Sequence, residues 1–306
     1  MTPELVIVGI LTSGIRLATP YLYAAIGETF GQRSGVLNLG VDGQMLLGAF
    51  AGFYVAFTTG SLGLGLLAAV LVGALMGLAM AFVTVNLQAE QGISGIGFYL
   101  FGLGMSELLF KMLLGTVETV KGFPEVHIPL LGDIPYVGEI FFQQNVMVYG
   151  AFLLVPLAWF VLNKTTLGLK IRSVGENPEA ADSLGVSVGR IRYFTIILGG
   201  SLSGVAGASM SIALLNVFQQ NMTSGLGFIA VALVYFGAWR AWGVLAGALL
   251  FSMVNSLQLW MQVLNIPIPS EIAIMLPYIL TIVVLVITVS RVRSPSALTK
   301  PFDRGD

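Results

Sequence analysis

The sequence predicts an all-α membrane protein that crosses the bilayer many times, and three features of its composition carry this prediction. Hydrophobic residues fill 56% of the 306 positions, charged residues fill 9%, and the mean hydropathy is +0.91. A soluble domain has roughly a quarter of its residues charged. The interior of a soluble domain would not hide so much apolar surface, so the expected solvent of this chain is a bilayer. The 38 glycines fit close helix packing in lipid.

The composition also excludes several classes of function. The chain has no cysteine and a single histidine, His127, which excludes disulfides, thiol chemistry and a multi-histidine metal site. We therefore expect no metal and no cofactor on this chain. The net charge of −1 argues against nucleic-acid binding. The N-terminus lacks a basic region and an obvious cleavage site, so no removable signal peptide is expected.

The first apolar stretch, Met1 to Phe30, allows two interpretations because it carries Arg16, Pro20 and Glu28. It is either one long span with Arg16 facing the bundle interior, or an interfacial helix followed by a short span from Leu17. A charge at membrane depth usually faces protein or water, and the sequence leaves both arrangements open.

Further apolar stretches predict more spans joined by short polar connections. They cover residues 41–57, 62–85, 93–114, 146–162, 193–215, 242–262 and 272–290, with a short and partial span at 228–239. Together with the first stretch they make about nine spans in one membrane domain over residues 1–306. Pro156 predicts a kink in the span that contains it.

Small residues recur every three or four positions in two of these spans. Such a repeat gives one smooth helix face for close contact. The repeats are Ala69, Gly73, Gly77 and Ala81 in one span, and Gly200, Ser203, Gly204, Gly207 and Ser211 in the other.

Arg33 to Gly43 is a glycine-rich polar segment between two apolar stretches, with Asn38 and Asp42 inside it. Such backbone survives at membrane depth only when it is buried in protein or lines a wet cavity. We expect a bent, protein-buried segment beside the solute route. Asp42 and Glu28 form a proton-linked pair of the kind that secondary transporters use, or Asp42 and Asn38 satisfy exposed backbone in a broken helix.

Arg172 to Ser187 is a polar island whose local code predicts one short helix over Pro178 to Leu184. Asn177 suits the N-cap and Pro178 the first helical position, and Gly185 can take the left-handed conformation that ends the helix. About two turns are too short to be stable alone in water. The helix is therefore either a capped surface loop or a piece held by something else.

Four segments of the chain resemble the permease subunits of ABC importers for nucleosides and simple sugars, which are related to the branched-chain amino-acid and ribose permeases. The Gly175 to Val186 segment reads Gly-Glu-Asn-Pro-Glu-Ala-Ala-Asp-Ser-Leu-Gly-Val and is similar to the coupling helix of that family. The other segments are 28–48, 225–237 and 268–280. They follow the order of the family and cover most of the chain.

The resemblance implies a type II-like importer fold with broken or re-entrant segments, and a function as half of an alternating-access pathway. The implied solute is a nucleoside or simple sugar, with riboflavin-like solutes also allowed. Residues 163–192 would be the cytoplasmic coupling loop, in which these residues dock on the ATPase subunit: Glu176, Asn177, Pro178, Glu179, Ala180, Ala181, Leu184 and Gly185.

The same resemblance implies partners: cytoplasmic ATPase subunits, an extracytoplasmic solute-binding protein and a second permease, often a different chain. The sequence has no Gly-x-x-x-x-Gly-Lys-Ser/Thr motif, so ATP and Mg²⁺ belong on the ATPase subunits. The chain itself is expected to be a transport subunit and not an enzyme. Whether the permease pair is homo- or heterodimeric stays open.

Basic residues predict the orientation in a bacterial inner membrane. Nine of the 14 basic residues lie on two segments, the coupling loop and the basic tail at 291–306. The positive-inside rule places both in the cytoplasm. The acidic connection at 115–145 then lies outside, and so does the N-terminus when nine spans are counted.

Polar groups within the spans are the candidates for the solute route. They are Asn38, Asp42, Glu107, Ser203, Asn255 and Gln258. Glu107 either lines a cavity or pairs with Lys111 one turn on, and Asn255 and Gln258 either line a polar route or bond neighbouring helices. Because most of the set are amides and hydroxyls, a neutral solute is expected.

Two other classes of function remain at this point. One is a secondary transporter or channel for a small polar solute, driven by Asp42, Glu28 or Arg16. The other is a membrane enzyme, against which the shortage of histidine and cysteine argues.

Overall fold

A computed structural model describes residues 3–264 and 293–303, together with a few isolated positions between 275 and 286. Most of the expected last span, Ile272 to Ser290, lies outside the described residues, as do Arg291 and Arg304 of the basic tail. Helices make up most of the described chain, as expected.

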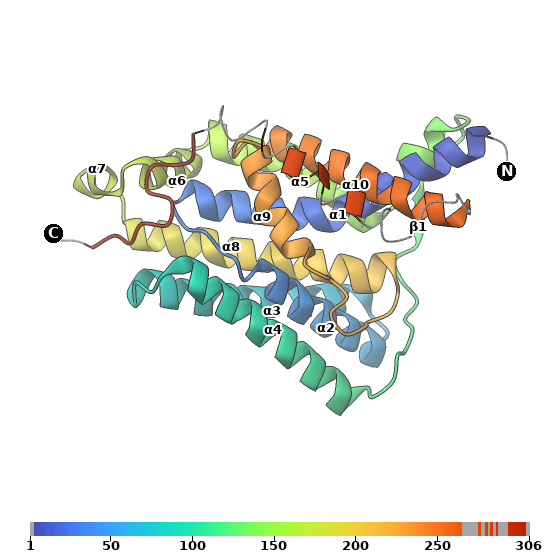
Figure 1. Cartoon of the computed structure of the whole chain (residues 1–306), viewed down its shortest axis with the longest axis horizontal. Helices are drawn as coiled ribbons and strands as arrows, with labels where there is room; N and C mark the ends of the chain where they lie inside the picture. The colour runs from blue at the N-terminus through green and yellow to red at the C-terminus, as the bar shows by residue number, and fades with distance from the viewer. Residues whose placement is uncertain are drawn as a thin grey trace.

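The long helices run roughly lengthwise through one elongated bundle (Figure 1). Their bounds are α1 Pro3–Arg33, α2 Val41–Thr59, α3 Leu62–Ala81 with the π-helical turn η1 Phe82–Asn86, α4 Gln91–Leu113, α5 Val146–Lys164, α8 Val188–Ser209 with the π-helical turn η3 Met210–Leu214, and α10 Ala241–Val263. The shorter elements are the π-helical turn η2 Gly138–Phe142 and the helices α6 Thr166–Glu176, α7 Pro178–Ser183 and α9 Leu226–Phe236. Two short strands, β1 Glu125–His127 and β2 Gln143–Asn145, pair antiparallel with Glu125 opposite Asn145.

Six stretches of the described chain are long and apolar enough to cross a membrane, which makes the protein a multi-pass membrane protein. They are Glu4–Arg33, Leu62–Asn86, Gln91–Leu113, Val146–Lys164, Val188–Leu214 and Ala241–Val263. The 19-residue α2 and the 11-residue α9 are not in this set. The number of nine spans therefore stays a prediction.

The two small-residue repeats, each of which predicts a close helix contact, pack against each other. A Cβ added to Gly73 of α3 would meet the backbone of Gly200 and Gly204 of α8, and one added to Gly48 of α2 would meet Gly204 from the other side. Three helices thus approach each other to backbone contact, which only small side chains allow.

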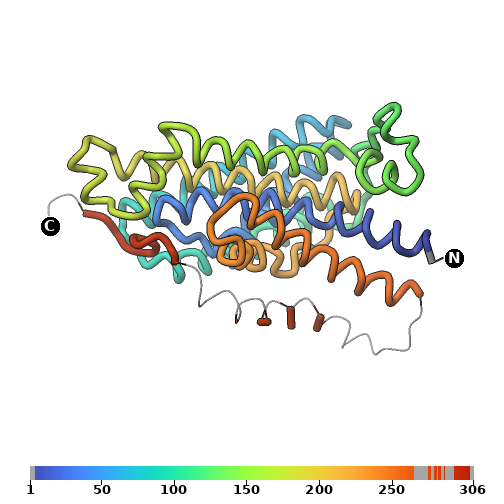
Figure 2. The backbone as a smooth tube through the Cα atoms, turned by 90° about the horizontal axis from the view of Figure 1, so that it is seen from above, coloured from blue at the N-terminus to red at the C-terminus, as the bar shows by residue number. Residues whose placement is uncertain are grey.

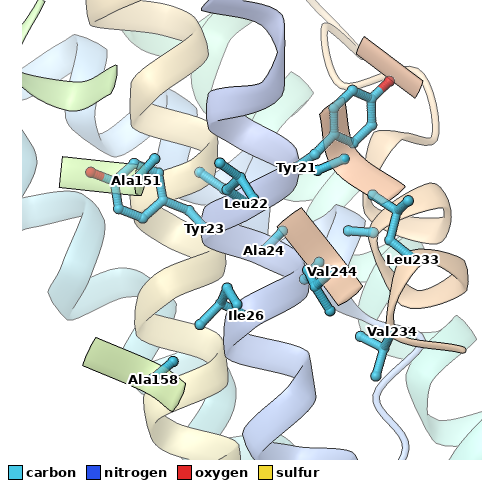
Figure 3. Close-up of a cluster of buried hydrophobic side chains, with 14 of the residues drawn as sticks. Tyr21, Leu22, Tyr23, Ala24, Ile26, Ala151, Ala158, Leu233, Val234 and Val244 are labelled. Carbon is cyan, nitrogen blue, oxygen red and sulfur yellow. The ribbon is translucent and has the colours of Figure 1, made fainter. Parts of the chain in front are cut away.

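Helix α1 lies beside α8 near the middle of the bundle, with α2, α3 and α4 on one side and α5, α9 and α10 on the other (Figure 1). Its residues Tyr21 to Ile26 face α5, α9 and α10 in the largest apolar cluster (Figure 3). A single unbroken helix over Pro3–Arg33 agrees with the first interpretation of this stretch.

Contrary to that interpretation, the side chain of Arg16 does not face the bundle interior. Its guanidinium donates to the Gln144 side chain at 2.9 Å and pairs with Glu125, both in the connection between α4 and α5. Arg16 is thus held by the loop region at one end of the bundle and not by the bundle interior. His127 Nε2 lies 3.1 Å from Asp133 Oδ1 on the surface of the same connection.

The two ends of the bundle carry different elements (Figures 1 and 2). The start of α1 and the β1–β2 ribbon lie at one end. Helices α6 and α7 lie at the other, together with residues 293–303. This places residues 163–192 and residues 293–303 at the same end, opposite the 115–145 connection.

Residues 293–303 form a segment, here named the C-terminal strap, that joins three parts of this second end. The amide of Ala297 donates to the Gly175 carbonyl at 2.9 Å, and the amide of Thr299 donates to the Gly35 carbonyl at 3.1 Å. Phe302 packs against the cluster that Ala181 of α7 forms with its neighbours. The strap therefore ties α6 and α7 to the α1–α2 connection.

Candidate translocation and coupling sites

The α1–α2 connection is buried backbone without helical structure, as the polar segment predicts. Ser34, Val36 and Asn38 are at most 4% exposed. Gly35 has a φ of +90°, a conformation that glycine adopts without strain, and it turns the chain back into the bundle. Arg192 of α8 holds this turn by donating from Nε to the Ser34 carbonyl at 3.3 Å.

Five buried polar side chains lie around this connection and are here named the polar centre: Glu28, Gln32, Asn38, Asp42 and Gln44. Glu28 Oε1 accepts from Gln32 Nε2 and from the Asn38 amide, each at 3.0 Å. Asn38 in turn donates to Gln44 Oε1 at 3.1 Å and accepts from the Gly40 amide at 2.9 Å. The centre thus fixes the conformation of the connection between α1 and α2.

Asp42 connects the polar centre to α9. Its Oδ1 accepts from the Gly227 amide at 2.8 Å and its Oδ2 accepts from the Thr223 hydroxyl at 2.9 Å. A carboxylate at a helix start satisfies free amides and meets the positive end of the helix dipole. Asp42 lies in the first turn of α2 and also caps α9, so the starts of two helices meet at one carboxylate.

These bonds match the second interpretation of the polar segment, in which Asn38 and Asp42 satisfy backbone groups of broken helices. Glu28 and Asp42 each accept a hydrogen bond from a backbone amide that has no acceptor within a helix. Neither bond joins one carboxylate to the other, as a proton-sharing pair requires.

Other route candidates lie on separate helices. Glu107 pairs with Lys111 at 2.7 Å on the exposed face of α4, so of its two interpretations the ion pair is the one observed. Ser203 of α8 is buried and donates to the Gly199 carbonyl at 2.9 Å. Asn255 and Gln258 are half-buried on α10.

The sequence analysis did not single out two members of the polar centre, Gln32 and Gln44, or two of its partners, Thr223 and Trp239. Gln32 lies one helical turn after Glu28, and this spacing in the sequence already predicts a contact between the two side chains. Trp239 donates from Nε1 to Gln32 Oε1 at 2.7 Å, and no local signal predicts a partner that is 207 positions away.

Helix α7 begins and ends as its sequence predicts, one residue short of the expected end. Asn177 Oδ1 accepts from the Ala180 amide at 2.9 Å, and Gly185 has a φ of +83°. Leu184 is 84% exposed, and Glu179 and Ala180 are exposed beside it. The small apolar face formed by Ala180 and Leu184 is therefore not covered by any described part of the chain.

Ala181 differs from these neighbours. It is 2% exposed and packs with Val174 of α6 and Val188 of α8. It therefore attaches α7 to the bundle and leaves the outer face to Ala180 and Leu184. The backbone of Gly175 lies against that of Arg33 so closely that a Cβ would overlap the Arg33 carbonyl.

The α3–α4 connection belongs to the same end. Gln88 donates to the carbonyl of Phe302 in the strap at 3.4 Å. Glu90 caps α4 by accepting from the amides of Ile93 and Gly92. These bonds lower the pKa of the Glu90 carboxyl because they stabilise its charged form.

Residues 10–285 match the family described as branched-chain amino acid transport system / permease component. The chain belongs to this permease family. The match spans every helix of the bundle that the structure describes, from α1 to α10.

Relatives of this permease carry names of ABC transporter permeases. The "Putative glucose ABC transporter permease protein" of Haloferax volcanii is 39% identical over 97% of this chain and 98% of its own. The guanosine ABC transporter permease protein NupQ of Bacillus subtilis is 37% identical over 94% of each chain. The nucleoside ABC transporter permease protein NupC of Lactococcus lactis is 36% identical over 92% of each. No solved structure gives a significant match.

The comparisons confirm the family that the four sequence segments predict. The coupling and route residues stay predictions, because a family match does not assign a role to any single side chain.

Proposed function

We propose that this permease forms one half of the translocation pathway of an ATP-driven importer that takes up a nucleoside or a simple sugar by alternating access. The names of its relatives support this solute class, because they specify guanosine, nucleosides and glucose. All are neutral solutes that bind through hydrogen bonds.

The observation that carries the proposal is the exposed apolar face of α7. Leu184 and Ala180 stand open on a short helix that its caps and Ala181 hold in place. A leucine at 84% exposure on an ordered helix fits a docking contact with a groove on another protein. ATP and Mg²⁺ belong on that second protein, the ATPase subunit.

A contact chain leads from α7 to the polar centre. Movement of α7 acts on α6 and α8 through Ala181, and α6 rests on the end of α1 where Gly175 meets Arg33. The α1–α2 connection starts directly after Arg33. A push on α7 therefore reaches the segment that Glu28 and Asn38 hold. A switch of this segment between two packed arrangements would open and close the pathway.

The polar centre offers hydrogen-bonding groups to a passing solute. Gln44 Nε2 is buried and has no hydrogen-bond partner among the described residues, and its amide oxygen bonds Asn38. With Ser203, Asn255 and Gln258 on other helices, Asn38 and Asp42 supply groups that suit a neutral ligand. In this proposal Glu107 stays outside the route, because it pairs with Lys111 on the surface.

The proposed architecture is a single membrane domain of the type II-like importer fold with about nine spans. The end that holds α6, α7 and the strap lies in the cytoplasm of a bacterial cell, since the basic segments gather there. Reporter fusions near Ser183 and after Lys300 are expected to report cytoplasm, and one near Pro129 the exterior. A cytoplasmic signal at Pro129 would reverse the orientation.

A second, different permease is the expected partner within the membrane. Bacillus subtilis has two guanosine permeases, 37% and 26% identical to this chain. Lactococcus lactis has two nucleoside permeases, 36% and 29% identical. One permease of each kind per importer accounts for such pairs, and an extracytoplasmic binding protein would deliver the solute to them.

The test is co-purification with the ATPase subunit, followed by solute-stimulated ATP hydrolysis in reconstituted membranes. Ala180→Arg and Leu184→Ala are expected to reduce both, since a buried leucine contact contributes about 2–5 kcal/mol. Glu179→Gln is expected to have a smaller, salt-sensitive effect, as a rim charge has. Thermal unfolding of the permease itself should not change in any of the three.

Three results would contradict the proposal. Full ATPase association in Ala180→Arg would mean that α7 is a capped surface loop. Uptake assays with a nucleoside, a hexose and a zwitterionic amino acid test the solute, and a preference for the zwitterion would overturn that part. Uptake that persists without any ATPase would indicate a secondary transporter.

A further inference from the structure

A cavity of about 840 Å³ opens at the end of the bundle that holds α6 and α7. Five parts of the chain surround it: the end of α1, the end of α5, α6, the turn between α9 and α10, and the start of α10. Three of the residues that line it are arginines, Arg33, Arg172 and Arg240. We name it the arginine cavity.

The positive charges of the arginine cavity are not neutralised by ion pairs within the described part of the chain. None of the ion pairs found there includes any of the three arginines. The charges of Arg172 and Arg240 repel that of Arg33, and the charge of Glu176 attracts it. Glu176 does not line the cavity and accepts a hydrogen bond from Ser296 at 3.2 Å.

The arginines also have free donors. Arg33 uses its Nε to donate to the Trp239 carbonyl at 2.9 Å. Arg172 Nε is buried and has no hydrogen-bond partner among the described residues. Gathered like charges with unused donors are costly unless an anion joins them, and guanidinium groups bind phosphate oxygens in pairs.

The surroundings of the cavity are those of a membrane interface. Trp159 and Trp242 line it and are exposed, and the Lys164 ammonium lies 5.8 Å from the centre of the Trp159 ring. Tryptophan and long basic side chains are enriched where the headgroups of a bilayer lie. The cavity is therefore placed at headgroup level.

An exposed apolar stripe leads away from the cavity along α5. Leu153, Leu157 and Phe160 are spaced at i, i+4 and i+7, which puts them on one helix face, and all three are exposed. Leu162 and Asn163, at the end of the same helix, line the cavity. Acyl chains would lie along such a stripe while the headgroup enters the cavity.

We propose that the arginine cavity binds the phosphate headgroup of an anionic phospholipid. Basic pockets between spans on the cytoplasmic side are suited to such headgroups, so the proposal uses the orientation proposed above. A bound lipid would hold α1, α6 and the α9–α10 turn together beside the coupling helix. The charge and the aromatic lining of the cavity favour this ligand. A carboxylate of a partner protein would satisfy the arginines but would leave the apolar stripe on α5 without a function.

The experiment measures lipid binding to the purified full-length permease in detergent by native mass spectrometry. The wild type is titrated with phosphatidylglycerol and with phosphatidylcholine of the same chain length, and inorganic phosphate is added as a competitor. Phosphatidylglycerol should bind at least about tenfold more tightly, and Arg172→Gln and Arg240→Gln should each weaken it about tenfold, as the loss of a charge-assisted hydrogen bond does.

Arg190→Gln is the matched control. Arg190 is a basic residue at the same end of the bundle and lines a different cavity, so its removal should leave lipid binding unchanged. Arg240 is exposed in a turn, so Arg240→Gln keeps the test valid if Arg172→Gln does not fold. Equal loss in Arg190→Gln would mean that binding follows total charge, and the proposal would fail.

Three other results would overturn the proposal. Equal affinity for both lipids would mean that the charge of the headgroup does not determine binding. Displacement of phosphatidylglycerol by millimolar phosphate would identify a site for the free anion. Unchanged lipid binding together with lost ATPase association in Arg240→Gln would assign the cavity to a protein contact. Because lipid binding is measured without the ATPase, its failure is distinct from a failure of the proposed function.

Discussion

Helix α7 and the polar centre differ in how far apart in the chain their partners lie. The cap of α7 joins Asn177 to Ala180, three residues on. Bonds of the polar centre join Asp42 to Gly227 and Gln32 to Trp239, 185 and 207 residues apart. Helix α7 is thus a local structure with an open face, whereas the polar centre combines local bonds, such as that of Gln32 to Glu28, with bonds that form only once the α9 region has packed.

This contrast implies a separation of roles. Changes in the polar centre should disturb the fold and transport together, because its side chains satisfy buried backbone groups. Changes on the outer face of α7 should disturb association with a partner and leave the fold intact.

Asp42→Ala is expected to have the largest effect. It leaves the Gly227 amide and the Thr223 hydroxyl without their acceptor, and each buried unsatisfied donor costs about 1–3 kcal/mol. The apparent Tm of the purified permease should fall and α9 should lose protection from hydrogen exchange. Asp133→Ala, at an exposed position, is the control. An unchanged Tm in Asp42→Ala would show that Asp42 does not cap α9.

Gly40→Leu is expected to follow in size. A Cβ at Gly40 lies 2.9 Å from the Phe98 Cβ and 3.0 Å from Asn38 Oδ1, so a leucine forces the α1–α2 connection away from α4. Overpacking typically costs about 1–3 kcal/mol, and transport should drop with it. Gly97→Leu on the exposed face of α4, where nothing lies within 4 Å of a Cβ, serves as the control. Wild-type expression and uptake in Gly40→Leu would count against a buried connection.

Asn177→Ala should have a smaller, local effect. Loss of an N-cap typically costs about 1 kcal/mol, and here it acts on a six-residue helix. Hydrogen exchange should increase at residues 179–183 while the Tm changes little. Ser187→Ala is a matched control, because Ser187 precedes α8 without a side-chain cap bond. A large fall of Tm in Asn177→Ala would mean that α7 is coupled to the bundle more strongly than its local cap indicates.

The smallest effect should appear on lowering the pH at the start of α4. The pKa of Glu90 is lower in the folded protein than in the unfolded chain, because the Ile93 and Gly92 amides stabilise the carboxylate. Its contribution to stability is therefore present above the unfolded pKa and is lost as the pH falls through the folded value. Hydrogen exchange at residues 92–94 should rise in acid, and Glu90→Gln should remove this dependence. A rise of equal size in Glu90→Gln would assign it to another group.

Local signals in the sequence predicted the elements whose partners are near in the chain. Asn177, Pro178 and Gly185 gave the limits of α7 within one residue, and the small-residue repeats of α3 and α8 predicted a close contact for each helix. Asn38 and Asp42 were recognised because polar groups between apolar stretches are costly unless they are bonded.

The remainder depends on tertiary contacts that no local pattern encodes. Thr223 and Trp239 join the polar centre from distant loops, and Arg16 turns to Glu125 and not to the bundle interior. Ala181 looks equivalent to Ala180 in sequence, yet the angular step between neighbouring helix positions places it inside.

The C-terminal strap has a consequence for biosynthesis. Its bonds to Gly35 and Gly175 join residues that leave the ribosome early to residues that leave it after α10 and the stretch that follows. The spans can insert one after another, but the bonds from residues 293–303 to Gly35 and Gly175 form only after this segment has been made. A chain without the strap would keep the packing of Ala181 on α6 and α8 and would lose the backbone bonds that join α6 to the α1–α2 connection.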